Sequence, residues 1–117
     1  MTEKGIWDYH QDAGYRLGID LIGYKVEATD GSIGKIDKHS EDMDTAHLVV
    51  DTGHWIFGRH VLLPAGTISR IDTAQEKVYV NRTKEQIRNA PEYDEAKYVG
   101  ESGYMEQLGR YYNQPHM

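Results

Sequence analysis

The central part of the chain, residues 24–81, is a succession of short strand-like runs separated by turn residues. Residues 24–28 alternate apolar and polar side chains with a period of two, which predicts a strand with one buried face. The Asp-Gly pair after this run is typical of a hairpin, because glycine accepts a positive φ. The return run, residues 33–38, contains Gly34, which indicates a bulge or a close backbone approach.

Four further runs complete this pattern. Residues 47–51 are apolar at their centre, which predicts a strand buried on both faces, and the run at 59–64 is stopped by its terminal proline. A last hairpin is predicted between residues 68–72 and 77–81. Together the runs predict an all-β fold, a small and mostly antiparallel barrel of six strands.

The period changes after the last run. Thr83 and Gln86 have the spacing of a capping box, which predicts a short helix that stops near Pro91. We therefore divide the chain into an N-terminal extension (1–20), a barrel domain (21–91) and a tyrosine-rich, partly helical C-terminal tail (92–117).

Composition narrows the classes of function. The chain has 117 residues, of which 38% are hydrophobic and 27% charged, and this is the composition of one ordinary globular domain. A formal net charge of −6 argues against nucleic acid or an anionic membrane as the main partner. No apolar run approaches the roughly 20 residues that a membrane-spanning helix needs, and the first residues are polar, which predicts neither membrane insertion nor a secretory signal. The absence of cysteine fits a reducing cytoplasm, where we expect the protein to reside.

The order and spacing of four segments resemble the PRC-barrel family, named after the cytoplasmic domain of the photosynthetic reaction centre H subunit. The segments are VEATDGSIGKID, HLVVDTG, WIFGRHVLLPAGTISRID and KVYVNRTKEQIRNAP, within residues 21–91. The chain looks most similar to the stand-alone bacterial members. This resemblance implies a six-stranded barrel that acts as an adaptor or assembly module. The family has no common catalytic residues, so the resemblance implies none here.

Two segments are candidates for contacts with a partner. Trp55, Ile56 and Phe57 are consecutive and cannot all point inward from an extended segment, so at least one is exposed, plugs a barrel end or is buried by a partner. Arg59 lies beside them. In the tail, helical spacing relates four residues that could dock on the barrel, on another subunit or on a partner, or could belong to a frayed end: Tyr104, Leu108, Tyr111 and Tyr112.

A metal site is the main alternative. Four histidines between His39 and His60, with aspartates nearby, could supply ligands for zinc or another divalent ion in a metal- or ligand-binding stress protein, but their spacing matches no known signature. No serine lies in an activating motif, and a six-stranded barrel is too narrow for a substrate cavity. We therefore expect a non-catalytic, cofactor-free adaptor that contacts proteins and forms homo-oligomers.

Overall fold

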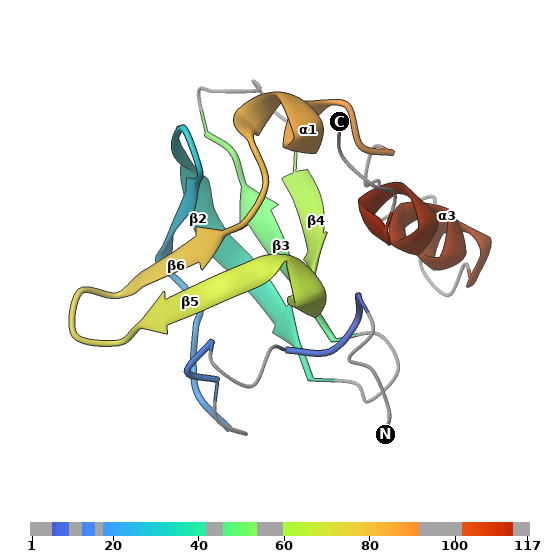
Figure 1. Ribbon diagram of the computed structural model, residues 1–117. Helices are drawn as coiled ribbons and strands as arrows, with labels where there is room; N and C mark the ends of the chain where they lie inside the picture. The colour runs from blue at the N-terminus through green and yellow to red at the C-terminus, as the bar shows by residue number, and fades with distance from the viewer. Residues whose placement is uncertain are drawn as a thin grey trace.

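The computed structural model describes residues 6–9, 13–15, 18–41, 46–53, 60–91 and 102–113. Within these ranges the chain forms one six-stranded sheet with few helices, as expected for an all-β fold (Figure 1). The elements are β1 (Lys25–Ala28), β2 (Gly31–Ser40), β3 (His47–Asp51), β4 (His60–Pro64), the 3₁₀ turn η1 (Ala65–Thr67), β5 (Ile68–Asp72), β6 (Lys77–Val80), α1 (Lys84–Arg88) and α3 (Ser102–Asn113). Among the described residues no helix has the length and apolar character needed to cross a membrane.

The strands lie in the order β4-β3-β2-β1-β6-β5. Four of the neighbouring pairs are antiparallel, and the β1–β6 pair is parallel. The sheet is therefore mixed, and the first strand of the sequence lies at its centre, between the second strand and the last.

The ladder of hydrogen bonds does not close into the expected barrel, since β4 and β5 are the two edges of the sheet. The N-terminal segment takes the place that a closing strand would occupy. The Ile71 N–H of β5 donates to the Ala13 carbonyl at 2.7 Å, and the Gly66 N–H of η1 donates to the Ile6 carbonyl at 2.6 Å. These donors are bound to the chain's own extension, so β5 does not pair with β4.

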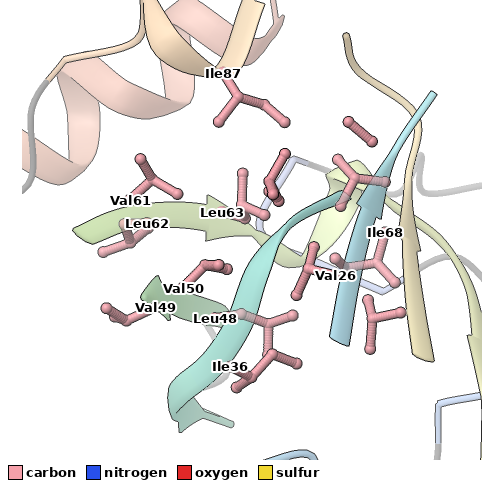
Figure 2. Close-up of a cluster of buried hydrophobic side chains, with 14 of the residues drawn as sticks. Val26, Ile36, Leu48, Val49, Val50, Val61, Leu62, Leu63, Ile68 and Ile87 are labelled. Atoms are coloured by element: carbon pink, nitrogen blue, oxygen red, sulfur yellow. The ribbon is translucent and has the colours of Figure 1, made fainter. Parts of the chain in front are cut away.

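A single apolar core fills the concave side of the sheet. Directly opposed residues share a face, so the registers align Ile36 of β2, Val50 of β3 and Val61 of β4 in one row. Figure 2 shows these side chains with Val26 of β1, and Ile87 of α1 above them. All are almost fully buried, and burial of such side chains is the main driving force for a domain of this size.

Gly34 lies where β2 is paired irregularly with β1 and packed closely against β3. The register between β1 and β2 shifts here, which confirms the predicted bulge. The residue has a φ of +146°, and a Cβ atom on it would overlap the Asp51 carbonyl oxygen and lie 2.9 Å from the Asp51 carbonyl carbon. The predicted close backbone approach is also confirmed, and it is made to β3.

The predicted capping box is present at the start of α1. The Thr83 hydroxyl accepts from the Gln86 N–H at 3.1 Å, and the Gln86 side chain accepts from the Thr83 N–H at 2.8 Å. The carboxylate of Asp30, in the β1–β2 turn, accepts from the Lys84 N–H at 2.8 Å. These contacts fix α1 against the end of the sheet, where Ile87 enters the core.

Candidate functional site

The outer face of the β3–β4 pair is unusually apolar. Side chains alternate along each strand, so Val49 and Leu62, which are directly opposed, point away from the core row of Val50 and Val61. They are nevertheless only 2% and 3% exposed. This face is therefore covered by other parts of the chain, and we call it the covered face, made of His47, Val49, Leu62 and Pro64.

Trp7 connects the covered face with the C-terminal helix. Its ring contacts His47 of β3 edge to face, with centroids 6.4 Å apart. The same indole approaches Gly109 of α3 so closely that a Cβ atom there would lie 2.9 Å from the Trp7 Nε1 atom. The two ends of the chain thus meet beside β3, which sequence patterns did not reveal.

Helix α3 confirms the helical spacing predicted for the tail. Its apolar stripe is directed into the protein, with Tyr104, Leu108 and Tyr112 almost fully buried and Tyr111 half-buried. The Tyr111 hydroxyl donates to the Gln86 carbonyl of α1 at 2.6 Å, and the Tyr104 hydroxyl donates to the Pro91 carbonyl at 3.3 Å. The sequence left several docking sites possible for this helix, and in the structure it packs on its own chain.

Arg82 anchors the end of α3. Its Nη2 atom donates to the Tyr112 carbonyl at 2.6 Å, and its guanidinium carbon lies 5.8 Å from the centre of the Tyr112 ring. Partial burial lowers the pKa of Arg82 from its usual value, but an arginine remains charged at any physiological pH. The last turn of the helix therefore has a cation at its carbonyl end, where the helix dipole favours one.

A second aromatic cluster joins the N-terminal segment to the end of β2. Tyr9 and Tyr15 stack with their ring centres 3.9 Å apart, and both contact His39 edge to face. The Tyr9 hydroxyl is hydrogen-bonded to His39 Nε2 at 2.9 Å. The Glu41 carboxylate accepts from the Tyr15 hydroxyl and, at 2.8 Å, from the Gly18 N–H. This cluster has no sequence signature, because its members come from segments that only the fold brings together.

The environment of this cluster fixes its protonation. Burial raises the pKa of Tyr9, and burial together with the Glu41 carboxylate raises the pKa of Tyr15, so both phenols stay neutral. Burial lowers the pKa of His39 from its usual value, which favours the neutral imidazole. The Tyr15 hydrogen bond lowers the pKa of Glu41, which stays a carboxylate. At neutral pH the cluster is a set of neutral rings attached to one anion, an arrangement that holds a segment in place.

The histidines of the proposed metal window take separate partners. His39 bonds to Tyr9, His47 contacts Trp7, and His60 Nε2 lies 3.6 Å from an Asp37 carboxylate oxygen. Within the described ranges no three His, Asp or Glu side chains gather where they could hold an ion. The fourth histidine, His54, lies outside those ranges.

The predicted contact residues Trp55, Ile56, Phe57 and Arg59 also lie outside the described residues. The strands that flank them are described, and Asp51 is directly opposed to His60. The chain between these two residues therefore connects the end of β3 to the start of β4.

The hydrogen-bond pattern shows which main-chain groups of β4 point away from the sheet. The Ala65 N–H donates to the Ala46 carbonyl at 2.9 Å, which fixes which residues of β4 are bonded to β3. By the antiparallel alternation, the main-chain groups of Leu63 and Val61 point to β3, and those of His60, Leu62 and Pro64 point away from it. Pro64 has no N–H, and its carbonyl accepts from the Thr67 hydroxyl at 2.7 Å. Leu62 is covered by other parts of the chain, so the outward groups of β4 that could pair with another strand are those of the partly exposed His60.

Compared with known proteins, the chain matches no protein-family model and no curated protein sequence.

Proposed function

We propose that this protein is a non-catalytic adaptor or assembly module of the PRC-barrel type, which acts through protein–protein contacts and self-associates. The family assignment rests on the ordered sequence motifs of residues 21–91, and the six-stranded sheet is compatible with it. The Asp30-Gly31 turn and the stop at Pro64, two features of those motifs, lie at a hairpin and at a strand end of the sheet.

The proposal rests on a difference between the two edge strands of the sheet, β5 and β4. The N-terminal segment is bonded to β5 at Ile71 and to the preceding turn η1 at Gly66. On β4, the outward main-chain groups of His60, which is partly exposed, have no backbone partner in the described part of the chain. An edge with outward donors and acceptors is a template for an added strand, and strand addition is a common mode of protein recognition.

Residues 54–59 connect the two strands at this edge and contain the apolar run Trp55, Ile56 and Phe57. Large aromatic residues are common in protein contacts, so we expect this run to add apolar area to the main-chain hydrogen bonds of a paired strand. Self-association through this edge would pair two equivalent copies of β4 about a twofold axis, because a twofold contact uses the same surface on both subunits.

Light scattering on the full chain over a range of concentrations tests this function. We expect a concentration-dependent dimer. His60→Pro removes one outward N–H and leaves the ladder to β3 intact, and it should raise the dissociation constant about tenfold. Trp55→Ala/Phe57→Ala should weaken the dimer at least as much.

Ile22→Ala is the matched control, since Ile22 is 51% exposed and lies away from β4. It should leave the dimer unchanged. A strict monomer at every concentration, or equal effects of the control and the β4-edge variants, would remove self-association through this edge.

A further inference from the structure

A row of charged side chains crosses the outer surface of five neighbouring strands. The registers place Lys35 of β2 directly opposite Lys25 of β1, and Lys25 directly opposite Lys77 of β6. The row continues to Asp51 of β3 on one side and Asp72 of β5 on the other. Across the sheet the sequence of charges is therefore minus, plus, plus, plus, minus.

The three lysines face the solvent. They flank core residues in the strand alternation, and Lys25 and Lys35 are exposed while Lys77 is half-exposed. In the described part of the chain none of the three forms an ion pair, although an aspartate stands at each end of the row. Both aspartates have other partners: Asp51 accepts from the Gly53 N–H, and Asp72 pairs with Arg70 and accepts from the Gln75 N–H.

Cross-strand pairing gives this arrangement little net stability. Like charges are directly opposed twice in the row, which destabilises the sheet, and unlike charges are opposed twice, Lys35 with Asp51 and Lys77 with Asp72, which offsets that repulsion. Outside the row, two acidic residues of the same face lie close to the lysines: Glu27 is two positions from Lys25 along β1, and Asp37 is two positions from Lys35 along β2. The local excess of positive charge is therefore confined to one short row, on a chain whose formal net charge is −6.

The size of the row defines what it could bind. Neighbouring strands are about 4.8 Å apart, so the backbones at Lys35 and Lys77 are separated by roughly 10 Å. The flanking aspartates and Glu27 repel anything negative that extends beyond this window. A long polyanion such as a nucleic acid would meet those carboxylates and the net negative charge, whereas a cluster of two or three carboxylates would lie within one screening length of the lysines.

We propose that the row formed by Lys35, Lys25 and Lys77, which we call the lysine row, binds an acidic segment of a protein partner with two or three neighbouring carboxylates. This inference rests on the proposed adaptor function and names the chemistry of its partner. The member of the lysine row nearest to β4 is Lys35 on β2, and β3 lies between those two strands, so one molecule could pair through the β4 edge and hold an acidic partner through the row.

The test is a titration of the ¹⁵N-labelled full chain with a blocked Gly-Glu-Glu-Glu-Gly peptide, followed by amide chemical shifts. We expect the shifts to concentrate on Lys25, Lys35, Lys77 and their strand neighbours, and the affinity to fall when NaCl is raised from about 20 to about 150 mM. Lys25→Glu/Lys35→Glu/Lys77→Glu should weaken peptide binding at least about tenfold.

The matched control is Lys84→Glu/Arg88→Glu/Arg110→Glu, which changes the net charge equally and affects only α1 and α3. It should keep most of the peptide affinity. Lys25→Gln/Lys35→Gln/Lys77→Gln removes two like-charge pairs and two unlike pairs of the row, so it should fold about as well as the natural chain, and it too should lose binding. Equal losses in the two reversed variants, shifts spread over all basic residues, or tighter binding of an oligothymidylate would each overturn the proposal.

Light scattering on the same samples separates this inference from the proposed self-association. A dimer that ignores the peptide would remove the lysine row as a binding surface and leave assembly through β4 in place. A monomer that binds the peptide through the row would do the opposite.

Discussion

The outer surface of this sheet has two halves, of which one is apolar and buried and the other is charged and exposed. On β3 and β4 the outward residues Val49 and Leu62 are apolar and buried, with Trp7 placed against the same face. On β2, β1 and β6 the outward row consists of lysines that face the solvent. The chain covers one half with segments near its own termini and leaves the other half exposed to solvent.

The single substitution expected to destabilise the protein most is at Gly34 of β2, between the two halves. Gly34→Ala would force a Cβ atom into the Asp51 carbonyl at a φ of +146°, which no ordinary side chain tolerates. We expect a loss of about 3 kcal/mol or more in the free energy of unfolding. Urea denaturation measures it, with Gly53→Ala as the control: Gly53 also has a positive φ, but nothing lies within 4 Å, so about 1–2 kcal/mol is expected.

The covered half depends on α3. Leu108 is completely buried, so Leu108→Ala should cost about 2–4 kcal/mol if the helix unfolds together with the sheet. Glu106→Ala, on the exposed side of the same helix, should change stability by less than about 0.5 kcal/mol. A small effect of Leu108→Ala in denaturation, with loss of amide protection confined to α3, would mean that the helix opens on its own.

The contact between the two termini is tested by a double-mutant cycle. Gly109→Ala gains about 1 kcal/mol of helix propensity but places a methyl group 2.9 Å from the Trp7 indole. We expect it to destabilise the natural chain and to stabilise the Trp7→Ala variant, a change of sign worth about 1–2 kcal/mol. Thermal unfolding of the four proteins measures the coupling, and equal effects in both backgrounds would show that the ring does not pack there.

The charged half should respond in the opposite way to mutation. Lys25→Gln removes both directly opposed like-charge pairs and keeps Lys35 opposite Asp51 and Lys77 opposite Asp72, so the protein should gain about 0.5–1 kcal/mol at low ionic strength. The gain should disappear in about 0.5 M NaCl, because salt screens exposed charges. A loss of stability on neutralisation would mean that the Lys25 stem contributes packing that outweighs the repulsion.

The smallest expected effect is the pH response of the aromatic cluster. Burial lowers the pKa of His39 in the folded state, so the folded protein resists protonation and the unfolded chain accepts it. The resulting stability is present above the unfolded pKa of about 6.5 and declines as the pH falls below it. Denaturation should be measured between about pH 7.5 and about pH 5.5, where Glu41 stays ionised because its pKa is lowered, and the decline should be weaker for His39→Gln.

The sequence predicted the local features well. The runs ending at Asp51, Pro64 and Asp72 became strands with those ends, and Gly34 lies at both a bulge and a close approach. Alternation, turn residues and capping are properties of neighbouring residues, so a single sequence contains them. The same reasoning found the helical stripe of α3.

The non-local features could not be found in this way. The lysine row requires the register of three strands, one of them paired in parallel, and no local pattern gives that register. The expected closure of the barrel was wrong because Ile71 and Gly66 bond to the N-terminal segment. The cluster of Tyr9, Tyr15 and His39 joins residues that are far apart along the chain.

Because β1 pairs with β6, the sheet can be completed only late in the synthesis of the chain. Lys25 is directly opposed to Lys77, so the central strand of the sheet has no partner on one side until nearly all of the strands have been translated. At about 5–20 residues per second, the ribosome takes several seconds to supply that partner. During this interval the emerging chain exposes an unpaired strand edge at the future middle of the sheet, and a nascent chain released before β6 would be prone to aggregate.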